Sequence, residues 1–175
     1  MRFIYLIIFL YCSINAKNYK IDSSLVTYFG NHVLHKWQGS TSDVQGVVLF
    51  NEVKNQYECN ISIPLSTFSS GNDSRDSNML IYCKAFDFPN ISFQSTSINV
   101  KKSSLEIEGK IGFAGKEKEI MTKAQLKSID SNMFSIEGEL NILLSEFDVE
   151  RPSLLFVEIE DLVKLKYSIQ GVQNE

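Results

Sequence analysis

Polar and apolar residues alternate without a break along residues 104–113. Leu105 and Ile107 fall on one side of this pattern, and Glu106 and Glu108 fall on the other. Because successive side chains of a β-strand face opposite sides of the sheet, the segment is predicted to be a strand with one buried and one solvated face.

The same alternation recurs along most of the chain, and no long helical period accompanies it. It predicts eight strands, joined by several connections short enough for antiparallel hairpins. The predicted strands cover residues 25–34, 44–53, 57–64, 90–100, 104–113, 119–129, 133–144 and 162–169. In the fourth strand the apolar positions change phase between Phe93 and Ile98, which predicts a bulge or a strong bend.

Two segments interrupt the strands. A polar loop at residues 69–74 precedes Ser77, which could cap a short helix over residues 78–86. The apolar stripe of this helix would consist of Met79, Tyr82, Cys83 and Phe86. A second irregular segment, residues 148–153, lies before the last strand.

The fold class is therefore all-β, and the strands can close as a barrel or as a sandwich. Hairpin-length connections favour an eight-stranded antiparallel, lipocalin-like β-barrel with one short helix between its third and fourth strands. The interior of such a barrel has room for side chains alone or for one slim ligand.

The composition fits one such domain, because the chain has 175 residues and 43% of them are apolar. Its formal net charge of -4 argues against nucleic acid as a partner. The charge also gives no support for electrostatic binding to anionic membranes.

The N-terminus resembles a targeting signal. Arg2 is followed by an uncharged apolar run at residues 3–11 that is too short to span a bilayer, and small residues lead to Ala16. We expect residues 1–16 to be a signal peptide and residues 17–175 to form the exported domain, periplasmic or secreted, with no integral membrane span. A retained anchor and lipidation of Cys12 are alternatives, although Tyr11 is bulky for a lipoprotein signal.

The expected mature chain keeps Cys59 and Cys83. In an exported protein these two residues could form a disulfide. Their places, in a predicted strand and in the predicted helix, suit two small buried residues equally well.

Candidate catalytic chemistry is sparse. His32 and His35 are predicted to point to opposite faces of one strand, so their local geometry does not favour a shared metal ion. The sequence contains no nucleophile elbow, P-loop or dinucleotide fingerprint. Glu106 and Glu108 are interpreted as a solvated face. We therefore expect neither an enzyme nor a catalytic cofactor.

Two further residues have both a structural and a functional interpretation. Trp37 could plug one end of the barrel or cover the mouth of a ligand site. Arg75, next to Asp76, could form an ion pair at the helix entry or contact a ligand.

The order of several motifs resembles that of the YceI-like family. The match to the family's central signature lies at Arg75-Asp76, Met79, Lys84-Ala85, Pro89, Ile91, Phe93 and Ser95. Downstream, a family hairpin is matched at Gly109, Gly115, Lys118 and Ile120, and two closing segments are matched at residues 147–153 and 161–163. Asp148 stands where the family usually has Gly, and the turn at residues 114–117 lacks the family's common Gly-Val-Thr.

This resemblance implies a lipocalin-like barrel in an exported protein that holds an amphiphile, typically a polyisoprenoid, and no catalytic residues. The expected lining of the lumen is Phe50, Ile61, Ile63, Phe93, Leu105, Ile107, Phe113, Leu126, Phe134, Ile136, Leu140, Ile142, Leu165 and Tyr167. The candidates for contact with a polar head group are His32, His35, Trp37, Arg75 and Arg151.

The alternative is a packed, non-catalytic barrel that acts as a scaffold in stress response or surface adhesion. Alternation demands burial only, so it does not distinguish a solid interior from a hollow one. The identity of the lipid, its donor and acceptor, and the formation of a homodimer are left open by the sequence.

Overall fold

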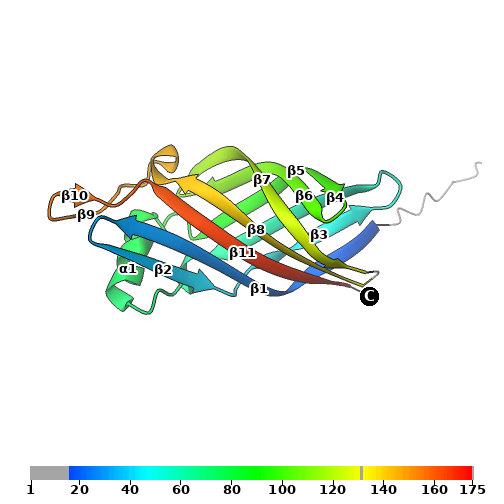
Figure 1. Cartoon of the computed structure of the whole chain (residues 1–175), viewed down its shortest axis with the longest axis horizontal. Coiled ribbons are helices and arrows are strands. Elements are labelled where there is room, and N and C mark those ends of the chain that lie inside the picture. The colour runs from blue at the N-terminus through cyan, green and yellow to red at the C-terminus, as the bar shows by residue number, and fades with distance from the viewer. Residues whose placement is uncertain (1–15, 131, 175) are drawn as a thin grey trace, which may run out of the picture.

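Long, strongly tilted strands wind around a single axis and form an elongated barrel (Figure 1). The computed structural model describes residues 16–130 and 132–174. Of the predicted signal peptide only Ala16 belongs to these residues, and Cys12 lies outside them.

The barrel wall is one antiparallel sheet whose two edges meet. The strands run in the order β11-β8-β7-β6-β5-β4-β3-β1-β2, and a further pairing of β11 with β1 closes the sheet. Their bounds are β1 Ala16–His32, β2 His35–Thr41, β3 Gln45–Asn51, β4 Gln56–Pro64, β5 Asn90–Lys101, β6 Ser104–Phe113, β7 Lys116–Ile129, β8 Met133–Leu143 and β11 Leu162–Gln173. The predicted all-β class and the closed antiparallel barrel are confirmed.

Strand β1 explains how nine strands form an eight-stranded barrel. On one side it pairs with β11, and on the other its first part pairs with β3 and its last part with β2. Strands β2 and β3 therefore lie one after the other beside β1 and act as one interrupted strand. The prediction of a first strand at residues 25–34 was wrong at both ends, because it began too late and included the two turn residues, Val33 and Leu34, that join β1 to β2.

The predicted irregularity in the fourth strand is confirmed as a register shift between Ser95 and Ser97, where β5 pairs with β6. Similar shifts lie between Ile21 and Ser23 in β1 and between Leu126 and Ser128 in β7. Because a bulge bends its strand and increases its twist, the three shifts help the sheet to curl on itself.

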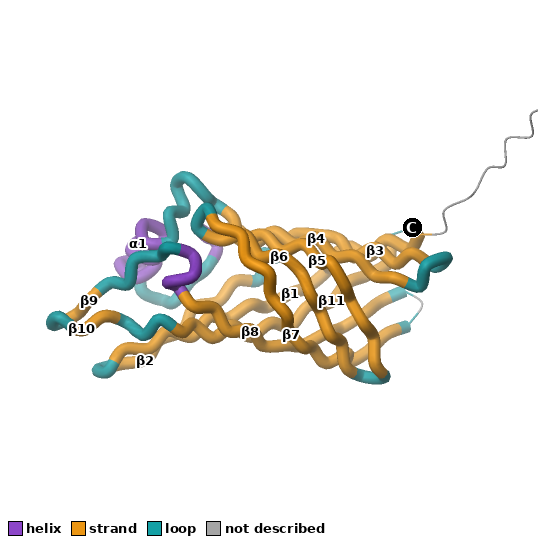
Figure 2. Tube along the Cα trace, turned by 90° about the horizontal axis from the view of Figure 1, so that it is seen from above, coloured by secondary structure: helices purple, strands orange, loops and turns teal. Residues whose placement is uncertain are grey.

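The two ends of the barrel differ (Figure 2). At one end lie α1 (Asp73–Tyr82), η1 (Leu65–Thr67), η2 (Leu144–Phe147), the β1–β2 turn and a small hairpin, β9 (Ser153–Leu154) with β10 (Val157–Glu158). We call this the α1 end. Short turns, among them β3–β4 and β5–β6, make up the opposite end. The hairpin β9–β10 was not predicted.

Helix α1 begins earlier than predicted. Asn72 rather than Ser77 is the N-cap, and its side chain accepts a hydrogen bond from Arg75 N at 2.9 Å. The carboxylates of Asp73 and Asp76 in the first turn interact favourably with the helix N-terminus. Lys84, with a φ of 55°, follows the helix in a left-handed conformation, so residues 84–86 do not continue it. No helix in the described parts of the chain combines the length and apolarity needed to cross a bilayer.

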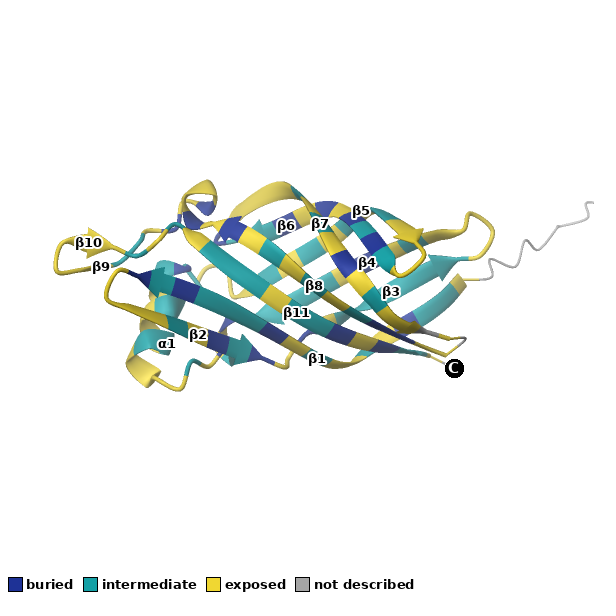
Figure 3. Cartoon of the chain, in the orientation of Figure 1, coloured by how far each residue is buried: buried dark blue, intermediate teal, exposed yellow. Residues whose placement is uncertain are grey.

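Burial alternates along the strands as predicted (Figure 3), and the buried apolar side chains pack in the interior of the barrel. At the α1 end the core centres on Phe147, of which 1% is exposed. Its ring packs edge-on against that of Phe113, with the ring centroids 5.5 Å apart. The 3-10 helix η2, which carries Phe147, is held by Asp161. This carboxylate accepts hydrogen bonds from Ser145 N at 2.8 Å and from Ser145 Oγ at 2.6 Å.

These hydrogen bonds from Ser145 lower the pKa of the Asp161 carboxyl below its usual value. A carboxyl with a lowered folded-state pKa stabilises the fold above its unfolded pKa and loses that contribution as the pH falls through the folded value. Because Asn keeps an acceptor oxygen but loses the charge, we expect Asp161→Asn to cost roughly 0.5–1 kcal/mol at neutral pH, the difference between a charged and a neutral hydrogen bond. The difference from wild type should begin to shrink near pH 4, the unfolded-state value, and should close as the pH falls through the lower folded-state pKa. Thermal unfolding across pH checks this, with Glu119→Gln as an exposed control. A constant difference at every pH would contradict it.

Candidate ligand-binding site

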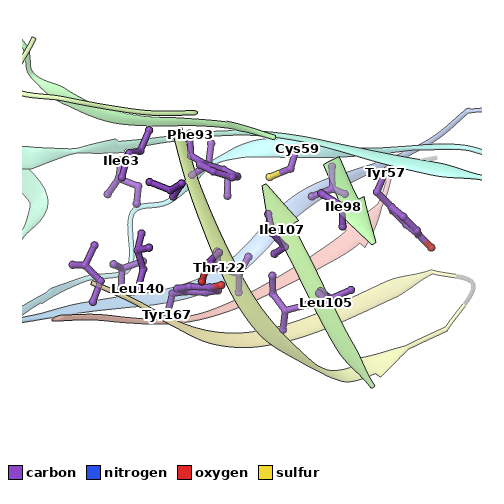
Figure 4. Close-up of a pocket in the computed structure, with 18 of the residues that line it drawn as sticks. Tyr57, Cys59, Ile63, Phe93, Ile98, Leu105, Ile107, Thr122, Leu140 and Tyr167 are labelled. Carbon is purple, nitrogen blue, oxygen red and sulfur yellow. The ribbon is translucent and has the colours of Figure 1, made fainter. Parts of the chain in front are cut away.

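The inward faces of the strands enclose an apolar lumen (Figure 4). The volume of the lumen that the centres of water molecules can occupy is about 180 Å³. In that measure a single water needs only about 10–15 Å³, so the barrel is hollow rather than packed solid.

Most side chains predicted to line this lumen do so. They are Ile61, Ile63, Phe93, Leu105, Ile107, Leu126, Phe134, Ile136, Leu140, Leu165 and Tyr167. Phe113 and Ile142 instead line a second cavity, described below. Phe50 lines neither cavity, and its ring stacks on Tyr57 at 4.5 Å.

Other lining residues were not included in the predicted lining of the lumen. Many share the phase of predicted inward positions: Val48, Tyr57, Cys59, Ile91, Ile98, Val100, Ile111, Ile120, Thr122 and Ile169. Alternation alone could have found these. Tyr19 lies in the unpredicted first part of β1, and Phe68 lies just after η1. Neither belongs to a regular alternation, so only the fold brings them to the lumen.

Cross-strand glycines keep large aromatic rings against the wall of the lumen. Tyr167 is paired with Gly138, and Phe134 is paired with Gly171. A Cβ atom at Gly138 would lie 2.3 Å from Tyr167 Cζ, and one at Gly171 would lie 2.3 Å from Phe134 Cε1. Each ring therefore occupies the space of a missing side chain, and the centre of the barrel stays free.

The few polar groups in the lumen are neutral. Burial raises the pKa of the Tyr167 hydroxyl, and it raises that of the Cys59 thiol to about 12. Thr122 lies beside Tyr167 (Figure 4), and its Oγ1 donates a hydrogen bond to Glu139 O at 2.9 Å. Within the described chain the Tyr167 hydroxyl has no hydrogen-bond partner. The Tyr167 hydroxyl can therefore donate to a polar atom inside the lumen without breaking an existing bond.

A second, more polar cavity of about 500 Å³, in the same measure, lies at the α1 end. We call it the end chamber. Its walls come from α1, the β1–β2 hairpin and the segment before β11. The end chamber and the lumen share four lining side chains, so the two spaces adjoin. The shared residues are Phe68, Ile91, Ile111 and Leu165.

Two of the head-group candidates, His32 and His35, are closer than predicted. The chain reverses at Val33 and Leu34, so the two histidines face each other across β1 and β2, with ring centroids 5.7 Å apart. The prediction that they point to opposite faces was wrong, because it assumed one continuous strand, whereas cross-strand pairs share a face.

The two histidines differ in their environment. His32 is 3% exposed, its Nδ1 accepts a hydrogen bond from Leu34 N at 3.3 Å, and its Nε2 donates to Val157 O at 3.1 Å. These bonds occupy both ring nitrogens and tie the two hairpins together. His35 is exposed. Among the described residues no group of three or more His, Cys, Asp or Glu side chains is arranged to bind a metal.

Trp37 and Arg75 meet in the end chamber. The Arg75 guanidinium lies 5.9 Å from the centroid of the Trp37 ring, within the range of a cation–π interaction. The ring of His35, which is also on β2, has its centroid 5.3 Å from that of Trp37. Arg75 Nη1 also donates to Ser70 Oγ at 3.3 Å. The neighbouring Asp76 accepts from Ser70 N at 3.0 Å, so it helps to hold the loop before the helix.

The remaining candidate, Arg151, does not line the end chamber. It forms an ion pair with Glu158 and donates a hydrogen bond to Ile159 O at 3.3 Å. Its role is therefore to hold the β9–β10 segment. The structure brings together His32, His35, Trp37 and Arg75 and leaves Arg151 outside.

The two cysteines of the described residues, Cys59 and Cys83, are free and buried, and one lines each cavity. Burial raises the pKa of the Cys83 thiol to about 12, as it does for Cys59. The sequence left open whether these cysteines form a disulfide or are two small buried residues, and the structure has the second arrangement.

A closed, lipocalin-like antiparallel barrel with an apolar lumen and a polar chamber at one end defines the structural class of this protein. The model of the YceI-like domain matches residues 19–171, and the chain belongs to this family. Protein YceI of Salmonella newport is 24% identical over 173 residues, covering 91% of this chain and 89% of that protein.

Solved structures share the fold. BcnA of Burkholderia cenocepacia superimposes with a TM-score of 0.73 at 18% identity, covering 84% of this chain and 95% of that chain. A polyisoprenoid-binding domain from Saccharophagus degradans also gives 0.73, at 12% identity, covering 89% and 98%. The YceI protein of Campylobacter jejuni gives 0.67 at 16% identity, covering 78% and 85%.

The cross-strand glycines can be tested by filling one of them. Gly138→Ala should push the Tyr167 ring into the lumen, lower the free energy of unfolding by about 1–3 kcal/mol as overpacking does, and reduce the space for a ligand. Chemical denaturation and a crystal structure of the variant measure the two effects. Asn141→Ala, on the outer face of the same strand, is the matched control. Equal stability of Gly138→Ala and wild type would show that the ring is not held as described.

Proposed function

We propose that this protein is an exported lipid-binding protein that holds an isoprenoid or a similar amphiphile, for transport or storage. The hydrocarbon chain lies in the lumen, and the polar head lies in the end chamber. The observation that carries this proposal is the adjoining pair of cavities, one almost wholly apolar and the other bordered by charged and aromatic side chains.

Burial of hydrocarbon supplies the driving force for binding. Each methylene transferred from water into the lumen contributes about 0.8 kcal/mol, so a five-carbon isoprene unit contributes roughly 3–4 kcal/mol before the cost of association. The neutral wall offers no group that would repel a hydrocarbon. The Tyr167 hydroxyl could donate to one polar atom along the ligand.

The end chamber suits a polar or anionic head group. Arg75 is its cation, and the Trp37 ring offers a flat apolar surface beside it. His35 and Asn78 add further hydrogen-bonding groups. His32 is less available, because both of its ring nitrogens are already bonded.

A solved structure with the same fold supports the ligand class, although its sequence identity to this chain is low. The Saccharophagus degradans domain is described as polyisoprenoid binding, and it shares this fold at 12% identity. The apolar N-terminal run supports export by removal of residues 1–16, to the periplasm or outside the cell. A non-catalytic scaffold is the alternative, and the hollow lumen counts against its packed form.

Native mass spectrometry of the gently purified protein tests the proposal directly. We expect a bound lipid that is released on unfolding. Ile107→Trp should fill the lumen and reduce lipid occupancy at least tenfold, whereas Glu108→Trp, on the outer face of the same strand, should leave it unchanged. A protein that carries no lipid and also takes up no isoprenoid probe would contradict the proposal.

The assignment of the head group to the end chamber has its own test. Arg75→Gln should weaken binding of an isoprenoid phosphate by roughly tenfold or more, the usual effect of losing one charged hydrogen bond. It should change the affinity for the uncharged isoprenol little. Emission of Trp37, the single tryptophan, reports both titrations. Equal loss for both ligands would place the head group elsewhere.

A further inference from the structure

Four large apolar side chains project from two tight turns at the α1 end. Val33 and Leu34 form the β1–β2 turn, and Leu155 and Phe156 form the β9–β10 turn. Their exposed fractions are 75%, 61%, 72% and 103%. We call these four residues the apolar tips. Both turns lie at the extreme α1 end in Figure 1, and Figure 3 shows them exposed.

The β9–β10 turn keeps its apolar residues at a conformational cost. Leu154 pairs with Val157, so Leu155 and Phe156 are the two central residues, and their φ angles are 53° and 67°. Turns with two positive φ values normally use Asn-Gly, because bulky residues are strained there. Leu155 and Phe156 do not favour the turn conformation, and they are not buried in a core. Strain and exposure at the same two residues indicate a function outside the monomer.

The two turns form one surface because their hairpins are bonded to each other. His32 Nε2 donates to Val157 O at 3.1 Å, and Glu160 N donates to Asn31 O at 2.9 Å. The surface also borders the end chamber, since Leu154 at the base of one turn and His32 at the base of the other line that cavity. The tips therefore lie next to the wall of the end chamber.

We propose that the apolar tips insert into the surface of a phospholipid bilayer and dock the α1 end on it. The side chains at the tips carry no charge, and Arg151 behind them is paired with Glu158. With a formal net charge of -4, the protein gains no general attraction to anionic lipids. The docking force is therefore burial of apolar side chains at the level of the lipid head groups.

A second copy of the chain fits these tips less well than a bilayer does. A stable dimer buries about 800 Å² on each partner. A large aromatic side chain buries roughly 150–250 Å², and three of the four tip residues are smaller aliphatic ones. Two projecting turns also penetrate a soft interface more readily than they form a flat one.

Docking in this orientation would present the end chamber to the membrane in which amphiphiles reside. That consequence rests on the proposed lipid-binding function, whereas the docking itself does not. The two proposals can therefore fail separately, one in lipid occupancy and the other in vesicle association.

The experiment measures co-sedimentation of residues 17–175 with phosphatidylcholine vesicles, because the described barrel begins at Ala16 and the apolar N-terminal run would itself bind lipid. We expect association that is the same at low and high salt. The double variant Leu155→Asn with Phe156→Gly should bind at least tenfold more weakly. Its melting temperature should equal or exceed that of wild type, because Asn-Gly suits the turn.

Two controls make this result specific. Val53→Asn removes a side chain that is 79% exposed in the β3–β4 turn at the opposite end, and it should leave vesicle binding unchanged. In Phe156→Trp, brominated lipids should quench the new tryptophan if the tip enters the bilayer.

Three outcomes would overturn the docking proposal. They are wild-type protein that ignores the vesicles, equal binding by the double variant, and binding that requires anionic lipid and disappears in salt. A wild-type dimer that the double variant converts to a monomer in analytical ultracentrifugation would assign the tips to a second copy instead. A double variant that loses vesicle binding but retains its bound lipid would separate docking from occupancy of the lumen.

Discussion

A barrel of eight strands has an interior that side chains can fill completely, and it stays hollow only where something holds them back. In this protein that constraint is the placement of glycine opposite large aromatic residues on neighbouring strands. Tyr167 over Gly138 and Phe134 over Gly171 lie flat against the wall. The free space of the apolar lumen, and any hydrocarbon that enters it, depend on these pairs.

Alternation predicted the strands that form the barrel, because a strand with one wet face must repeat polar and apolar residues with a period of two. It failed for β2, whose sequence from His35 to Thr41 is nearly all polar apart from Trp37. That failure had a second effect at the site. Since the turn at Val33 and Leu34 was missed, His32 and His35 were assigned to opposite faces, although they meet across the hairpin.

The rest of the site depends on contacts that no local pattern contains. The cation–π contact of Arg75 with Trp37 joins α1 to β2, and the pairing of Arg151 with Glu158 removes that arginine from the end chamber. The start of α1 was missed for a different reason. Its first turn is polar and its buried surface is small, so only the cap at Asn72 and the acidic residues Asp73 and Asp76 signal locally where it begins.

The double pairing of β1 has a consequence for the order of folding. The seam of the barrel joins the first described strand to the last, through contacts such as Tyr28 with Leu165. Contacts so distant in sequence form late, because a long loop of chain must first be ordered. The cavity thus has a closed wall only after the C-terminal strand has docked, and a chain synthesised from its N-terminus has no finished compartment until its last residues have emerged.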